Sequence, residues 1–182
     1  MIVAWGQPAL IGWLGALSAS FGFALFLVAI DQLSPKQRIL LAGLWFMAVQ
    51  LVQLSWMSSI EFQGYYILAV YGAIALLLGG QFAFFVSTIP IGRLSWGRIL
   101  ACSALWACLE WSRLFVFCGF SWNPIGLGLC YFSVSLQWAS IWGVLGLSFW
   151  VMLTNLVVFN CEFYEEYQYH GRSLVHLSSG KG

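Results

Sequence analysis

Long apolar runs separated by short polar stretches dominate this chain. A helix of about 20 apolar residues crosses the ~30 Å hydrocarbon core of a bilayer. Five stretches reach or approach that length: residues 9–30, 39–56, 66–89, 96–117 and 135–159. Because lipid offers the backbone no hydrogen-bond partner, each stretch is predicted to be α-helical. The pattern therefore predicts an all-α fold, a polytopic integral membrane helical bundle with about five transmembrane helices.

Composition agrees with a lipid environment. Only 7% of the 182 residues are charged and 62% are hydrophobic, whereas a soluble domain has about 25% charged residues. The net charge is +1 and no basic cluster occurs, which argues against nucleic-acid binding. The five cysteines form no CxxC pair and lack metal-ligand spacing. We interpret them as small hydrophobic residues and expect neither a metal nor a cofactor.

Basic residues in the loops predict the orientation. Lys36 and Arg38 follow the first span, and Arg93 and Arg98 follow the third. Basic loops face the cytoplasm in most membrane proteins. This rule makes loops 31–38 and 90–98 cytoplasmic and loops 57–65 and 118–134 periplasmic.

Both ends of the chain look incomplete in this arrangement. Met1 would start outside, just before the first span, and a missing preceding helix would explain that position. After Asn160 the sequence is polar and holds no further span. We therefore divide the chain into a transmembrane helical domain, residues 1–159, and a polar cytoplasmic tail, residues 160–182. The tail is expected to be disordered or to result from a truncation.

Glu110 and Arg113 bring charge into the fourth span. Being three residues apart, they share a helix face and can pair. Glu110 lies roughly 18 Å along the helix from Arg98, at about 1.5 Å per residue. Ions at such depth cost about 2.5–3.5 kcal/mol each, so they should face protein or water and find partners. One interpretation is a neutralised pair that fixes helix packing; the other is the polar wall of a site open to the outer leaflet.

The stretch after this pair is aromatic where an external loop is expected to be polar. It reads CGFSWNPIGLGLCYF over residues 118–132. Pro124 ends a helix, and non-helical backbone at membrane depth must be buried in protein or lie at the interface. We expect this loop to form a hydrophobic mouth that admits acyl chains; the alternative is simple packing. The candidate substrate-binding or lipid-entrance residues are Glu110, Arg113, Gly119, Phe120, Trp122 and Asn123.

Other residues give weaker signals. Glu61, near Trp56 on the same side, is either part of the mouth or a solvated loop acid. Asn155 is expected to hydrogen-bond a neighbouring helix. Small side chains in the fifth span predict the close approach of another helix: Gly143, Gly146 and Ser148.

No catalytic motif can be identified. Ser/His/Asp arrangements, GxSxG and metal motifs are missing. Cys118 lies beside the predicted mouth, but apolar surroundings raise the pKa of a thiol and make it a poor nucleophile. We assign no catalytic residue.

Several motifs together resemble the N-terminal membrane domain of bacterial apolipoprotein N-acyltransferases. That family has a Glu-x-x-Arg helix, a Gly-Phe-Pro-Trp loop and a Gly-Val-x-x-x-x-Phe pattern in the next helix. Here Ser121 stands where the family usually has proline. The similar stretches are residues 96–100, 104–113, 119–123, 136–150 and 154–156, with Gly6-Gln7-Pro8 and Leu54-Ser55-Trp56 as further matches.

The resemblance implies a reaction for the complete enzyme. An acyl chain moves from a phospholipid donor to an enzyme cysteine, and then to the N-terminal diacylglyceryl-cysteine of an apolipoprotein. Family members are more than twice as long, and a nitrilase-like domain supplies their Glu-Lys-Cys triad. None of its motifs occurs here, so the chain is expected to be inactive alone.

The same resemblance implies a place and a role for the chain. It would anchor the enzyme in the bacterial inner membrane and shape lipid access, with Glu110 and Arg113 stabilising that architecture. An alternative is a non-catalytic membrane remnant or lipid-binding scaffold. A small transporter is disfavoured, because no internal repeat and no matching pair of broken spans occurs.

Overall fold

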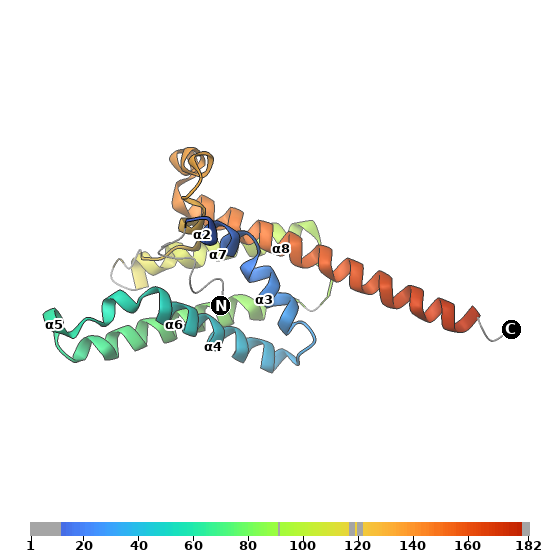
Figure 1. The fold of residues 1–182 in the computed structure, drawn as a ribbon, viewed down its shortest axis with the longest axis horizontal. Helices are drawn as coiled ribbons and strands as arrows, with labels where there is room; N and C mark the ends of the chain where they lie inside the picture. Colours follow the sequence, from blue (N-terminus) through green and yellow to red (C-terminus); the bar gives the residue numbers. More distant parts are fainter. Residues whose placement is uncertain (1–11, 91, 117–118, 120–121, 180–182) are drawn as a thin grey trace.

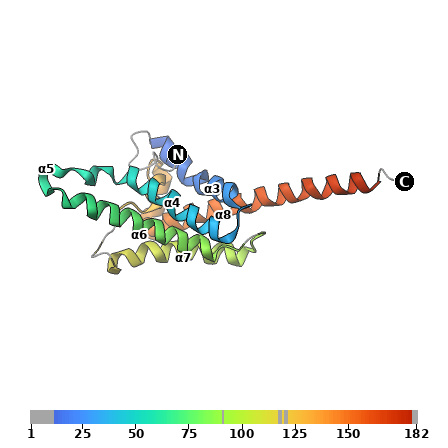
Figure 2. The same cartoon turned by 90° about the horizontal axis from the view of Figure 1, so that it is seen from below.

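The computed structural model describes residues 12–90, 92–116, 119 and 122–179, and within these the regular structure is entirely helical. Long helices dominate it (Figures 1 and 2). In chain order the elements are α2 (Gly12–Leu17), the π-helix η1 (Ser18–Gly22), α3 (Phe23–Ile30), α4 (Pro35–Gln53), the 3-10 helix η2 (Ser55–Ser58), α5 (Ile60–Gln63), α6 (Tyr66–Thr88), α7 (Trp96–Val116), the 3-10 helix η3 (Ile125–Leu129) and α8 (Ser133–Ser179).

Within the part of the chain that the structure describes, three helical stretches are long and apolar enough to cross a membrane, judged by length and composition. They are Trp13–Ile30, Tyr66–Thr88 and Ser133–Cys161. The 19-residue α4 and the 21-residue α7 are of similar length but carry more polar side chains. The predicted all-α, polytopic bundle of about five helices is confirmed.

The second long helix starts earlier than predicted. Hydropathy placed its beginning at residue 39, but α4 begins at Pro35. The side chain of Gln37 reaches back to the backbone N–H of Ser34, 3.2 Å away, and forms a capping box with it. Proline at the first helical position needs no N–H partner. Local capping therefore decides this boundary, and the apolar run does not.

A π-helical turn interrupts the first span, and Asn155 of α8 holds it. The Asn155 amide nitrogen donates to the carbonyl oxygen of Ala19 at 2.5 Å, and its amide oxygen accepts from the N–H of Ala24 at 2.8 Å. A π-turn displaces backbone groups from the regular helical ladder, so a buried amide that serves both is stabilising. The predicted hydrogen bond from Asn155 to a neighbouring helix is confirmed.

α4 and α6 form a hairpin through α5 (Figure 2). Their backbones approach most closely at two glycines. A Cβ built on Gly79 would lie 2.7 Å from the carbonyl oxygen of Gly43 and 2.9 Å from Cβ of Met47. Small residues permit such an approach. In lipid the hydrophobic effect does not drive helices together, so van der Waals contact between closely packed backbones contributes to their association instead.

α8 changes direction at Gly143. This residue has φ +67°, in the left-handed region that favours glycine. Figure 1 shows the preceding segment turned away from the long axis of α8. The predicted close approach is therefore corrected in detail, because Gly143 is a kink and Gly146 lies against the side chain of Trp142. Of the three small residues, Ser148 does meet a neighbour, and that neighbour is η3.

Helical backbone continues through the predicted tail. α8 extends to Ser179, and Figures 1 and 2 show it projecting beyond the bundle. Residues 160–170 contain no glycine or proline to end a helix. The domain boundary at residue 159 stays a prediction.

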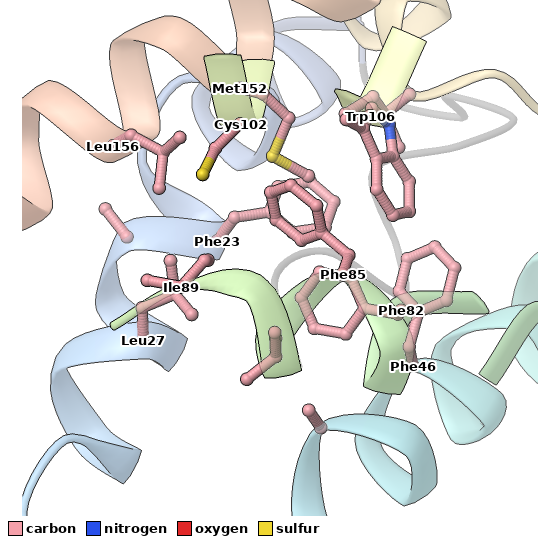
Figure 3. Packing of buried hydrophobic residues seen from close by; sticks show 14 of the residues in the cluster. Phe23, Leu27, Phe46, Phe82, Phe85, Ile89, Cys102, Trp106, Met152 and Leu156 are labelled. Carbon is pink, nitrogen blue, oxygen red and sulfur yellow. The ribbon is translucent and has the colours of Figure 1, made fainter. Parts of the chain in front are cut away.

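Aromatic side chains fill the centre of the bundle (Figure 3). Phe82 of α6 lies in the middle of this cluster, with ring centroids 4.8 Å from Phe46, 5.7 Å from Trp106 and 5.8 Å from Phe23. These four side chains are at most 1% exposed. Edge-to-face and offset contacts of this kind add about 0.5–1.5 kcal/mol per pair to simple burial. The cluster joins α3, α4, α6 and α7 beneath the candidate site.

Candidate functional site

Glu110 joins α7 to the loop that follows it. Its side chain is nearly completely buried, at 4% residue exposure. Oε1 accepts a hydrogen bond from Nε1 of Trp106 at 3.0 Å and another from the backbone N–H of Ile125 at 2.9 Å. Hydrogen bonds to a charged acceptor are stronger than neutral ones. Glu110 is thus a structural anchor between the fourth span and η3.

Arg113 lies one turn further along α7 and contacts a different helix. Its Nε donates to Oε1 of Gln81 on α6 at 2.7 Å, and Nε2 of Gln81 donates to the carbonyl of Leu109 at 2.6 Å. The guanidinium also lies over the ring of Trp106, 5.7 Å from its centroid, a distance at which cation–π attraction operates. Arg113 therefore ties α7 to α6.

The two charges do meet, though loosely. Nη2 of Arg113 is 4.0 Å from Oε1 of Glu110, and both side chains are at most 3% exposed. This separation allows electrostatic attraction without a direct hydrogen bond. The short hydrogen bonds of each residue go to other partners: Glu110 binds Ile125 and Arg113 binds Gln81. The two charges thus neutralise each other while each side chain attaches α7 to a different segment.

The loop after α7 is attached to α4 through Asn123. Its Nδ2 donates to Oε1 of Gln50 at 3.0 Å and also to Oε1 of Gln53. Gln50 and Gln53 are themselves buried and linked to each other by a 3.3 Å hydrogen bond. Asn123 has φ +59° and Gly119 has φ +87°, conformations favoured by asparagine and glycine. The turn geometry and the amide cluster together fix the loop.

An exposed aromatic edge lies beside this amide cluster. Trp122 and Trp56 are 56% and 51% exposed, and their ring centroids are 4.8 Å apart. Trp122 belongs to the loop, while Trp56 belongs to η2 after α4. Phe120, the other predicted aromatic site residue, lies outside the described residues. Glu61 is exposed in the first turn of α5.

η3 packs closely onto α8. The N–H of Gly126 donates to Oγ of Ser148 at 3.0 Å. A Cβ built on Gly126 would lie 2.6 Å from the carbonyl oxygen of Val144, so no larger residue fits without displacement. Together with Glu110 on one side and Asn123 on the other, this contact holds the loop against three helices: α7, α4 and α8.

The polar partners on α4 and α6 were missed by sequence reasoning. Gln50, Gln53 and Gln81 are amides inside apolar runs, and buried polar groups in such runs must find hydrogen-bond partners. Their presence was the available signal. The same argument predicts the hydrogen bond of Asn155, and it applies equally to these three glutamines.

The described residues offer little reactive chemistry. They contain no group of three or more His, Cys, Asp or Glu side chains that could hold a metal ion. Cys130 lies in the loop, and burial raises the pKa of its thiol, which lowers its thiolate fraction. Cys118 lies outside the described residues. The described part of the site combines buried polar contacts with an exposed aromatic edge.

Comparison with known proteins decides the family. A family model described as "Apolipoprotein N-acyltransferase N-terminal domain" matches residues 2–157. This chain belongs to that family. The predicted resemblance to the N-terminal membrane domain of this family is thereby confirmed.

Individual family members agree. An apolipoprotein N-acyltransferase of Allorhizobium ampelinum is 32% identical over 142 residues, covering 76% of this chain and 22% of the relative. One from Sinorhizobium medicae is 33% identical over 139 residues, covering 74% of this chain and 21% of the relative. One from Chlamydia caviae is 29% identical over 164 residues, covering 86% of this chain and 30% of the relative. The chain thus spans less than a third of the length of each relative, and no solved structure matches it.

Proposed function

We propose that this chain is the membrane part of an apolipoprotein N-acyltransferase, where it anchors the enzyme and shapes lipid access. The reaction proposed for the whole enzyme transfers an acyl chain from a phospholipid to the N-terminal diacylglyceryl-cysteine of an apolipoprotein. Both substrates are held in the membrane by their own acyl chains. A membrane domain that offers them an apolar opening serves such a reaction directly.

The observation that carries this proposal is the rigid support beneath an exposed aromatic edge. Trp122 and Trp56 are about half exposed and contact each other. The side chain of Asn123 attaches the loop after α7 to α4, and the side chain of Glu110 attaches the same loop to α7. Indole rings favour the membrane interface, where one side is apolar and the other is wet. An edge fixed in this way suits contact with fatty chains.

The candidate residues divide into two roles under this proposal. Glu110 and Arg113 are buried and hold the architecture, so neither is exposed to a substrate. Gly119 and Trp122 are exposed and line the opening, with Asn123 as their support. The polar-wall interpretation of the charged pair is therefore set aside in favour of the packing interpretation.

We also propose the orientation that the basic loops predict. Loops 57–65 and 118–134 are periplasmic, and loops 31–38 and 90–98 are cytoplasmic, in a bacterial inner membrane. Trp56 and Trp122 then face the periplasmic leaflet together. Their contact supports placing the two loops on the same side of the membrane, and the basic loops on the other side predict that this side is periplasmic.

Photo-crosslinking tests the lipid-access role. The chain, purified in lipid nanodiscs, carries p-benzoylphenylalanine at position 122 or, as the matched control, at position 40. Leu40 is also an exposed apolar residue and lies near the N-terminal end of α4. A synthetic lipopeptide with a diacylglyceryl-cysteine should crosslink several-fold more at 122 than at 40. Equal crosslinking at both positions contradicts the proposal.

A transfer assay tests the second part of the proposal. The chain alone, mixed with phospholipid and the diacylated lipopeptide, should give no triacylated product. Turnover by the chain alone would show that its own residues perform the chemistry, and the assignment of a purely supporting role would be wrong.

A further inference from the structure

A pocket lies at the N-terminal end of α7, whereas the loop that carries Trp122 follows the C-terminal end of this helix. It occupies about 460 Å³ between the C-terminal end of α6 and the N-terminal end of α7. This is within the range of about 300–1,000 Å³ for small-molecule sites. None of the candidate site residues contributes to it. The residues that matter for its chemistry are Ser87, Thr88, Arg98, Ala101, Cys102 and Leu105.

The α7 wall of this pocket has a polar end and an apolar end. Arg98, Ala101, Cys102 and Leu105 are spaced i, i+3, i+4 and i+7 and so share one face of the helix. Arg98 is in the first turn, and Leu105 lies roughly 10 Å further along at about 1.5 Å per residue. Trp96, two residues before Arg98 in the first turn of α7, is exposed, as expected for a residue at the membrane interface. A charged head followed by an apolar wall matches the outline of a phospholipid.

The charge of the pocket favours an anion. Its lining includes the Arg98 guanidinium and no Asp or Glu. The two ion pairs seen among the described residues involve Arg38 and Arg113, so Arg98 is left without a carboxylate partner there. A guanidinium presents several N–H donors in a planar fork that matches phosphate oxygens.

The α6 wall adds hydroxyl groups. Oγ of Ser87 donates to the carbonyl of Phe84 at 2.6 Å, and Oγ1 of Thr88 donates to the carbonyl of Phe85 at 2.7 Å. Each hydroxyl oxygen keeps lone pairs that can accept a further hydrogen bond. A head group that bears its own hydroxyls, next to a phosphate, would supply those donors.

We propose that this pocket binds one anionic phospholipid with a hydroxyl-bearing head group, from the leaflet at the Arg98 end of the bundle. Its phosphate contacts Arg98, its head-group hydroxyls donate to Ser87 and Thr88, and an acyl chain lies along Ala101 and Leu105. The site is separate from the proposed lipid entrance, since it lies at the opposite end of α7. It does not depend on the acyltransferase role.

Native mass spectrometry of the full 182-residue chain in detergent tests this site. Phosphatidylglycerol is titrated against the wild-type chain, Arg98→Gln, Ala101→Trp and the control Lys36→Gln. Lys36 lies in the first turn of α4, is exposed and does not line the pocket. We expect retention of the first lipid to be about tenfold weaker in Arg98→Gln, as for the loss of a charge-assisted contact. The control should match the wild type.

Additional measurements identify the ligand and test whether a loss of binding is due to misfolding. Ala101→Trp keeps the charge but fills the pocket, so a chain that remains helical by circular dichroism should still lose the lipid. Phosphatidylcholine with the same acyl chains should bind more weakly, and excess inorganic phosphate should not displace phosphatidylglycerol. Displacement by phosphate would assign the pocket to a free anion and overturn the proposal. Equal weakening by Arg98→Gln and Lys36→Gln, or full retention by folded Ala101→Trp, would also overturn it.

Discussion

The carboxylate of Glu110 accepts the backbone N–H of Ile125 across 2.9 Å, so a charged residue of the fourth span holds the loop that follows that span. This contact gives the buried acid a purpose that sequence spacing did not reveal. The loop carries Trp122, and its opposite side is tied to α4 through Asn123. A substitution at Glu110 should therefore destabilise the loop more than it destabilises the helices.

Glu110→Ala should release the loop. It leaves two buried donors, Nε1 of Trp106 and the N–H of Ile125, without their shared acceptor. An unsatisfied buried group costs about 1–3 kcal/mol. Hydrogen–deuterium exchange in detergent should show faster exchange at residues 125–129 than in the wild type. Glu61→Ala removes an exposed acid and serves as the control; unchanged exchange in Glu110→Ala contradicts the anchoring role.

Glu110 and Arg113 should show coupled effects on stability. Arg113→Ala leaves a buried carboxylate 4.0 Å from an emptied partner position, and a lone buried ion is strongly destabilising. The double variant Glu110→Gln/Arg113→Ala removes both charges and keeps an acceptor for Ile125. Thermal unfolding should show the double variant no less stable than Arg113→Ala. Additive losses would mean that the two charges act independently.

Gly79→Ala should destabilise the α4–α6 hairpin. The new methyl would lie 2.7 Å from the carbonyl of Gly43, and overpacking of this kind costs typically about 1–3 kcal/mol. The adjacent Gly80→Ala is the matched control, because its Cβ would meet no atom within 4 Å. Alanine is a better helix former by about 1 kcal/mol, so Gly80→Ala should be neutral or stabilising. Similar melting temperatures for both variants would contradict the close approach.

Asn155→Leu should loosen the π-helical turn of the first span. The substitution leaves the carbonyl of Ala19 and the N–H of Ala24 without their side-chain partner. Thr154→Ala is the control, because Thr154 is exposed and its hydroxyl bonds only carbonyls of its own helix. Unfolding in detergent should place Asn155→Leu about 1–3 kcal/mol below the control. Equal stabilities would show that Asn155 does not hold that turn.

The length of the apolar runs was enough to predict the helices but not their connections. Length and hydropathy identify a span whatever its neighbours are, so α6 and α7 begin where they were expected. Partner choice depends on three-dimensional placement, which spacing does not contain. The sequence therefore predicted that Glu110 and Arg113 could pair, but their shorter contacts with Ile125 and Gln81 required the fold.

The kink at Gly143 shows a similar limit. Glycine permits a left-handed conformation but does not require it. In an apolar run, a glycine is equally compatible with a kink and with close packing against a neighbouring helix. Neighbours that only the fold supplies, here Gly126 against Ser148 and Val144, fix the segment just beyond the kink. The same applies to Gln50 and Gln53, whose role depends on an asparagine about 70 residues away.

Sidedness of residue 122 tests the central claim most directly. In a cysteine-free chain, a single cysteine is placed at position 122 or at position 96, and a membrane-impermeant maleimide is applied to intact spheroplasts and to inverted vesicles. The account predicts that position 122 is labelled from the periplasmic side and position 96 from the cytoplasmic side. Labelling of position 122 from the cytoplasmic side alone would contradict a lipid entrance in the periplasmic leaflet.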